Sequence, residues 1–117
     1  MIEFTAAGRM AHLRRLAAAG VSLGLFTNQD AGATFEEPTA REYVPIRVPA
    51  GDWVIDVTTE SGTIPERGWA FTSEVGAVYG WFARVDGQVE FFERFAQPYT
   101  INQIGDQIRV AVELSPV

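Results

Sequence analysis

Residues 77–95, AVYGWFARVDGQVEFFERF, contain two apolar stretches separated by the dipeptide Asp86-Gly87. This dipeptide is a preferred pair for a two-residue type I′ turn, in which both residues take positive φ. The sequence therefore predicts a β-hairpin with strands at 77–85 and 88–95.

The length of the turn fixes the predicted register of the hairpin. The predicted opposite pairs are Val85–Gln88, Phe82–Phe91, Trp81–Phe92 and Tyr79–Arg94. The last pair would bring a guanidinium group over an aromatic ring as a cation–π contact.

Aromatic side chains fall on both faces of this hairpin, whereas a strand pair with one face in water alternates apolar with polar residues. We therefore expect a second sheet to cover one face and another part of the chain to cover the other. The N-terminal helix described below, from the same subunit or exchanged with a neighbour, is the cover that we consider.

Further strands are predicted on both sides of the hairpin, most plainly at 108–114, where Ile, Val, Val and Leu occupy alternate positions. The other predicted strands and extended pieces are 21–27, 43–48, 53–59, 69–75 and 98–101, and the predicted loops are 28–42 and 60–68. Pro45 places the strand at 43–48 on an edge or at a bulge. Seven or eight short strands predict a mostly β chain, folded as an antiparallel β-sandwich or a jelly-roll-like domain.

One stretch, residues 5–19, has the composition and spacing of an α-helix. Thr5 is a suitable N-cap, and Gly20 suits the left-handed residue that ends a helix. The predicted apolar stripe is Ala6, Met10, Leu13 and Ala17. We assign 1–117 to a single domain, with the helix at 5–19 and the sandwich at 21–115.

Composition excludes several classes of protein. The 117 residues include no Cys, so disulfide scaffolds, thiolate nucleophiles and cysteine zinc sites are excluded. No apolar stretch reaches the roughly 20 residues that span a bilayer, and the N-terminus lacks the order of a signal peptide. The net charge of −6 does not favour nucleic acid as a partner. We therefore expect neither a membrane nor a nucleic-acid role.

Charge is divided unevenly along the chain: residues 1–29 carry +2 and residues 30–117 carry −8. Arg9, Arg14 and Arg15 supply the positive charge of the first segment. They form either a solvated helix face or a basic element that meets an acidic surface on a neighbouring subunit.

Residues able to carry reaction chemistry are few. His12 is the single histidine, no serine lies in a G-x-S-x-G motif, and a zinc site lacks ligands. The acidic pairs considered for calcium are Asp52 with Asp56 and Glu36 with Glu37, and they fit solvated acids better because no D-x-D-x-D-G loop is present. Paired carboxylates could also serve a small hydrolase, but fifteen acidic residues bring some pair close by chance. No catalytic residue, metal or cofactor is predicted.

The three tryptophans, Trp53, Trp69 and Trp81, leave two interpretations open. Exposed indoles stack on sugars or bases. Trp53 and Trp69, however, lie in phase with apolar neighbours along their strands, which favours packing in the core.

Several stretches together resemble small β-rich virion proteins of tailed bacteriophages. They are Ser22–Asn28 (SLGLFTN), Glu42–Val48 (EYVPIRV), Trp53, Trp69–Phe71, Gly80–Phe82, Arg94–Pro98 and Asn102–Val110 (NQIGDQIRV). The short turn at residues 84–87 departs from the longer loop expected there in that family. The resemblance implies a structural role without cofactor or active site, as a capsid decoration (cement) protein or as a tail or fibre component.

From this resemblance we expect a virion protein, assembled in the host cytoplasm, whose partners are itself and other virion proteins such as the major capsid protein. A homodimer or homotrimer is the expected oligomer. The candidate interface residues are Arg9, Arg14, Arg15, Tyr79, Trp81 and Phe92. A carbohydrate-binding module that uses tryptophan platforms is the alternative.

Overall fold

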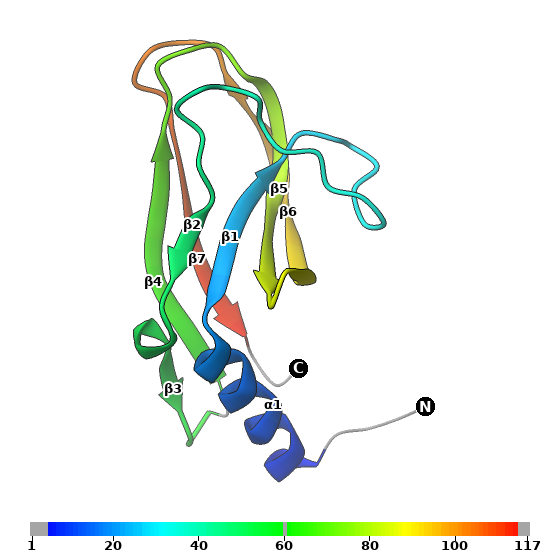
Figure 1. Cartoon of the computed structure of the whole chain (residues 1–117), viewed down its shortest axis with the longest axis vertical. Coiled ribbons are helices and arrows are strands. Elements are labelled where there is room, and N and C mark those ends of the chain that lie inside the picture. Colours follow the sequence, from blue (N-terminus) through cyan, green and yellow to red (C-terminus); the bar gives the residue numbers. More distant parts are fainter. Residues whose placement is uncertain (1–4, 60, 115–117) are drawn as a thin grey trace.

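A computed structural model describes residues 5–59 and 61–114, without the side chains of residues 6 and 9. The elements are α1 (Ala6–Ala19), β1 (Val21–Phe26), β2 (Ile46–Val48), the 3₁₀ turn η1 (Ala50–Asp52), β3 (Val54–Asp56), β4 (Ser61–Ala70), β5 (Gly76–Val85), β6 (Gln88–Ile101) and β7 (Gln107–Leu114). The strands form two antiparallel sheets, β2-β1-β5-β6 and β3-β4-β7, stacked as a sandwich (Figure 1). The predicted β-sandwich with an N-terminal helix is confirmed. The described strands number seven, in sheets of four and three, whereas a jelly roll has eight.

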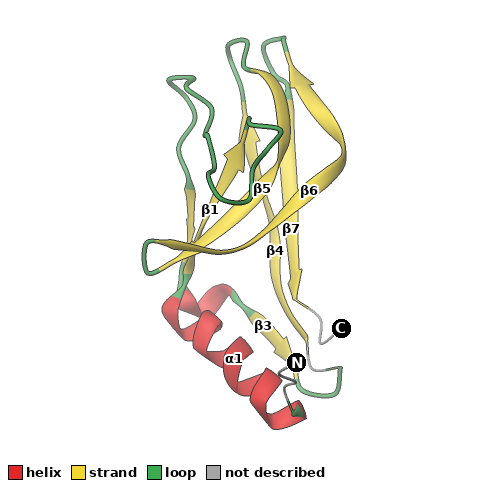
Figure 2. Cartoon of the chain, turned by 90° about the vertical axis from the view of Figure 1, so that its right-hand side faces the viewer, coloured by secondary structure: helices red, strands yellow, loops and turns green. Residues whose placement is uncertain are grey.

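Helix α1 begins and ends as its sequence predicts. The Thr5 hydroxyl accepts a hydrogen bond of 3.0 Å from the Gly8 amide, and Gly20 follows the helix with φ of 71°. Leu13, Leu16 and Ala17 are buried in the core, so Leu16 was missing from the predicted stripe. The helix closes one end of the sandwich (Figures 1 and 2), so the expectation that it covers the second face of the hairpin within its own subunit is wrong.

The β5–β6 hairpin has the predicted turn, with φ of 52° at Asp86 and 83° at Gly87. The predicted register holds only next to the turn. Beyond Arg84 and Val89, β6 contains an extra residue, so that Phe82 pairs with Phe92 rather than with Phe91. This β-bulge shifts the pairs from Ala83 to Gly80 by one position, and a second irregularity between Gly80 and Val78 shifts the pairs beyond it further.

Strand β4 occupies most of the predicted loop at 60–68, which is a correction. Pro65 and two glycines suggested a loop, but the pairing with β7 has an irregularity between Ile64 and Arg67, where β4 has one more residue than β7. A bulge is one of the few places where a sheet accepts proline. The strand then ends at Ala70, so the predicted strand at 69–75 is wrong beyond that residue.

Two predicted strands are shorter than expected. β2 begins only after Pro45 and is an edge strand as predicted, whereas the segment predicted at 53–59 is a strand only at Val54–Asp56. Residue 115, the last predicted residue of the sandwich, lies outside the described residues.

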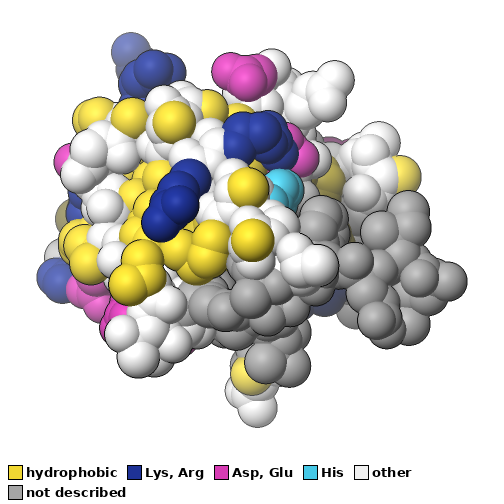
Figure 3. Space-filling model, turned by 90° about the horizontal axis from the view of Figure 1, so that it is seen from below, with side chains coloured by type: hydrophobic (Ala, Val, Ile, Leu, Met, Phe, Trp, Pro, Cys, Tyr) yellow, Lys and Arg dark blue, Asp and Glu magenta, His cyan; other side chains and the backbone are white. Residues whose placement is uncertain are grey.

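The main core fills the space between the two sheets and beneath α1. It contains Trp53, Trp69 and Trp81, all buried, beside Phe71, Ile64 and the inward side chains of β1 and β7. At the closed end, seen from below in Figure 3, apolar and arginine side chains gather on the surface.

Candidate functional site

Residues 27–45, which we call the strap, join β1 to β2 and fold over the outer face of the four-stranded sheet (Figure 2). Asn28 holds the strap together from a buried position. Its side chain accepts a hydrogen bond of 2.9 Å from the Glu36 amide and donates one of 2.9 Å to the Thr34 carbonyl. An Asn side chain can substitute for backbone partners in this way, so the strap needs no sheet partner of its own.

Beneath the strap lies an aromatic cluster formed by Phe26, Phe35, Phe82 and Phe92. The Phe35 ring centroid lies 5.6 Å from that of Phe26, 5.1 Å from that of Phe82 and 5.2 Å from that of Phe92. These separations are in the range where aromatic pairs stabilise each other. The strap therefore supplies the cover that the two-sided aromatic hairpin required.

Arg94 fastens the strap to β6. Its guanidinium donates hydrogen bonds to the carbonyl oxygens of Gln29, at 2.8 Å, and of Ala31. The same group lies 5.8 Å from the ring centroids of Phe26 and Phe92. The predicted contact of Arg94 with Tyr79 is therefore wrong, because the extra residue in β6 places Arg94 opposite Gly80.

A groove of about 450 Å³ opens beside the aromatic cluster, between the tip of the strap and the first half of β6. Its walls are formed by Gly32, Ala33, Phe35 and residues 88–92. Phe92 is 42% exposed there, and Glu90 forms an ion pair of 3.6 Å with Arg15 of α1. The groove is open to solvent and combines aromatic rings with an acidic side chain that is already paired within the chain.

Tyr43 fixes the other end of the strap to β1. Its hydroxyl accepts a hydrogen bond of 3.0 Å from the Leu25 amide and donates one of 2.6 Å to Glu37, which also pairs with Arg84 at 3.5 Å. Because β2 begins at Ile46, opposite Leu23, this hydroxyl takes the place of a strand partner for Leu25 on the β2 side of the sheet. Burial and the bond to Glu37 raise the pKa of Tyr43 above its ordinary value, so the phenol stays protonated.

Glu42 joins the strap to the loop after β4. One of its carboxylate oxygens accepts hydrogen bonds from the Thr72 amide at 2.8 Å and from the Ser73 amide and hydroxyl at 2.9 and 2.8 Å. The bond from the Ser73 side chain is the largest cause that lowers the pKa of Glu42 to about 2. This carboxylate is therefore an anionic clasp between two loops rather than a proton acceptor for reaction at neutral pH.

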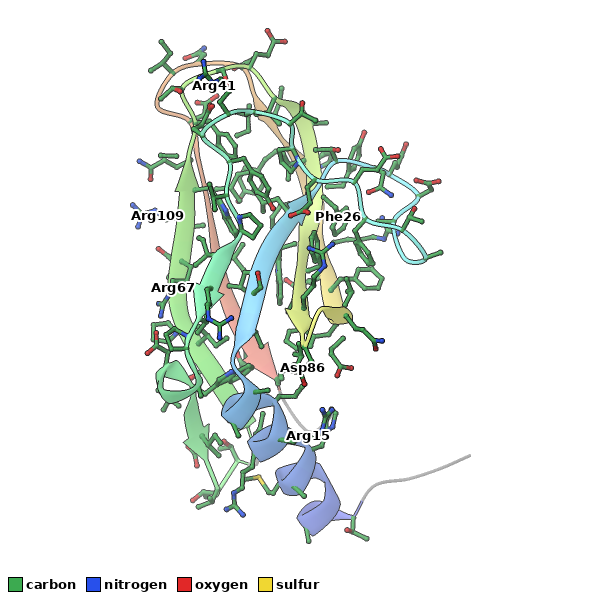
Figure 4. The ribbon with its side chains drawn as sticks, viewed as in Figure 1. Arg15, Phe26, Arg41, Arg67, Asp86 and Arg109 are labelled. Carbon is green, nitrogen blue, oxygen red and sulfur yellow. The ribbon has the colours of Figure 1, made fainter. Side chains whose placement is uncertain are left out.

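The candidate interface residues do not form one surface. Phe92 and the half-buried Tyr79 lie at the outer face of the four-stranded sheet, whereas Trp81 is buried between the sheets, so that Trp81 is not available to a partner. Arg14 and Arg15 are exposed on α1, where Arg15 also lies 3.5 Å from the ring of His12 (Figure 4). The side chain of Arg9 lies outside the described residues.

The other sequence candidates serve local structure. Asp52 forms an ion pair of 2.7 Å with Arg67, and Asp56 accepts hydrogen bonds from the amides of Thr58 and Thr59. The described residues contain no group of three or more His, Asp or Glu side chains arranged for a metal ion. Because all three indoles are buried, they do not meet the exposure that a sugar-stacking platform requires.

The strap residues Asn28 and Phe35, which organise this surface, were not among the residues predicted from the sequence. Phe35 is the only aromatic residue in the predicted loop 28–42, and Asn28 lies two residues after the end of β1. These two features were the available signals, since an isolated aromatic in a polar loop needs a place to be buried.

Comparisons with family models, with curated proteins and with solved structures gave no match to this chain. Among the described residues, no helix has the length and apolar character needed to cross a membrane.

Proposed function

We propose that this chain is a non-enzymatic structural protein of a bacteriophage particle, a capsid decoration (cement) protein that oligomerises and binds the lattice of the major capsid protein. Support comes first from the sequence stretches that resemble such proteins. They coincide with elements of the sandwich, namely β1 with Asn28, the centre of β5, the second half of β6, and β7 with the turn before it.

The observation that carries the proposal is that polar side chains hold the strap in place against the sandwich. Glu42, Tyr43 and Arg94 each tie the strap to the sandwich through hydrogen bonds with backbone or side-chain partners. Side chains used in this way make loops rigid, and rigid loops present a fixed surface at little entropic cost on binding. A protein that decorates a shell needs such a fixed surface more than it needs a reactive group.

Exposed apolar residues occur at both ends of the sandwich. Ile104, 83% exposed, lies in the loop between β6 and β7, and Val57, 64% exposed, follows β3 near α1 (Figure 1). Exposed apolar side chains at loop ends are suited to contacts with another protein.

Co-sedimentation with empty shells tests the proposal. The shells are assembled from the major capsid protein of the particle to which the chain is proposed to belong, and purified tails of the same particle serve as the second target. We expect saturable binding to shells. The variants Ile104→Asp and Val57→Asp are a matched pair, because each puts a charge at one exposed end, and we expect one of them to lose binding. Binding to tails alone would favour a tail component, and binding to neither would contradict the proposal.

A further inference from the structure

Most sheet edges of this protein carry features that discourage pairing with another chain. A bare edge presents unpaired N–H and C=O groups, and proteins protect it with short strands, proline or bulges. β2 and β3 have only three residues each, and β4 beyond β3 contains Pro65 and an extra residue. β6 contains Pro98 and has two irregularities in its pairing with β5.

β7 is the exception. It pairs with β4 alone within the described part of the chain, and over its eight residues it has neither proline nor an extra residue of its own. Buried and exposed side chains alternate strictly from Gln107 to Glu113. This edge is regular, extended and open to another strand.

The sequence of β7 is complementary to itself. Residues 108–114, IRVAVEL, read nearly the same in both directions around Ala111, with opposite charges at the two mirrored positions. If two copies pair antiparallel with Ala111 opposite Ala111, then Arg109 of each copy faces Glu113 of the other. On the inner face Val110 meets Val112, and Ile108 meets Leu114. Opposite charges and apolar side chains at facing positions stabilise strand pairs.

Neighbouring registers lack this match. Centring on Arg109 or on Glu113 brings two like charges face to face, which destabilises a strand pair. Centring on Val110 or Val112 places one charge of each copy opposite Ala111. Among these registers, the one centred on Ala111 alone pairs both charges.

The two charges are available for this contact. Arg109 projects from the outer side of its sheet (Figure 4) and pairs with Glu66 at 3.0 Å, where the side chains are 64% and 53% exposed. Such exposed pairs contribute little to stability, so Arg109 can exchange partners. Glu113 is exposed and has no ion-pair or hydrogen-bond partner among the described side chains.

We propose that two copies of this chain pair antiparallel through β7, which joins their three-stranded sheets into one six-stranded sheet with Ala111 at the two-fold axis. The contact is isologous and closes at two subunits. This proposal rests on the proposed function, because it identifies the surface through which the proposed oligomer self-associates. The dimer is a property of the free protein, so its test is separate from the test of capsid binding.

Analytical ultracentrifugation of the full chain, compared with variants that reverse the charge at Arg109 or at Glu113, tests the dimer. We expect the wild type to have twice the chain mass of 12.9 kDa. Arg109→Glu or Glu113→Arg should raise the dissociation constant roughly tenfold or more, since each puts two like-charge pairs into the interface. The double variant should regain dimerisation. Glu66→Gln is the matched control, because it removes only the contact of Arg109 within the subunit.

Because the chain has no cysteine, a single introduced cysteine provides a second test that does not depend on charge. Residues facing across a strand pair have Cα atoms about 4.5–5.5 Å apart, within the range of a disulfide. Oxidation of Ala111→Cys should therefore give a covalent dimer, whereas Gln97→Cys on the edge of β6 should not. A wild-type monomer or trimer, charge variants that dimerise like the wild type, or equal cross-linking at both positions would each overturn the proposal.

Discussion

The outer face of the β2-β1-β5-β6 sheet and the free edge of β7 each present groups that are costly to leave uncovered. The outer face presents aromatic side chains and the β7 edge presents backbone N–H and C=O groups, and the chain treats the two differently. Over the outer face, the strap covers Phe26 and Phe82, and Asn28, Tyr43 and Arg94 hold it in place. At β7, eight regular residues have no neighbour on one side within the described chain. Apolar surface is thus buried inside the subunit, whereas backbone hydrogen-bonding capacity is left open for another copy.

The largest effect on the free energy of unfolding is expected from a substitution that tests whether the strap buries the outer face in solution. Phe82 is fully buried under the strap, so Phe82→Ala should lower the free energy of unfolding by about 3–5 kcal/mol. Phe92→Ala is the matched control and should lower it by less, because Phe92 is partly exposed. Urea denaturation measures both, and equal losses would show that the strap is not closed over Phe82.

A smaller loss is expected at the polar centre of the strap. Asn28→Ala leaves the Glu36 amide and the Thr34 carbonyl without partners, which should cost about 1–3 kcal/mol. Hydrogen exchange at the Glu36 amide should become faster in the same variant. Asn102→Ala, at an exposed position, should stay within about 0.5 kcal/mol of the wild type. Unchanged exchange at Glu36 would contradict the role given to Asn28.

The clasp at Glu42 should make the attachment of the strap dependent on pH. Folding lowers the pKa of Glu42 from its ordinary 4.5 to about 2, so the folded state binds this proton less readily than the unfolded chain. The stabilisation is therefore complete above pH 4.5 and is lost as the pH falls through 2. The urea midpoint should fall less between pH 5 and pH 2.5 in Glu42→Gln than in the wild type. Parallel curves for the two proteins would argue against the clasp.

The smallest effects are expected at the exposed charges of both regions. Arg15→Gln removes an ion pair of 3.6 Å with Glu90 and should change the free energy of unfolding by less than about 0.5 kcal/mol. Glu113→Gln at the edge of β7 should do the same at protein concentrations where the chain is monomeric. A loss above 1 kcal/mol in either variant would mean that these charges support the fold of the subunit.

Local signals in the sequence predicted the elements that depend on local geometry. The cap at Thr5 and the type I′ turn at Asp86-Gly87 each need only a few neighbouring residues, and both are present as predicted. The alternation along β7 also gave the correct inward face, because a regular strand keeps its period.

Predictions failed where an extra residue interrupts a strand. The bulge in β6 has no local sequence signal, and Pro65 in β4 fits a loop as well as a bulge, since each bulge is set by how two strands align across the sheet. Pro65 consequently suggested a loop in place of β4, and the register of Phe82 was wrong by one residue. The strap could not be assigned from sequence either, because Phe35 finds its partners on strands distant in the chain.

The central place of β1 in its sheet has a consequence for the order of folding. Ser22 pairs with Arg84 on one side and with Arg47 on the other, so β1 cannot complete its hydrogen bonds until much later parts of the chain are in place. The β5–β6 hairpin needs only its own turn and forms on a timescale of about 1–10 μs. Pairings that close long loops are slower. We therefore expect the strand synthesised first to dock among the last, with the rate of folding set by the arrival of β1 beside β5.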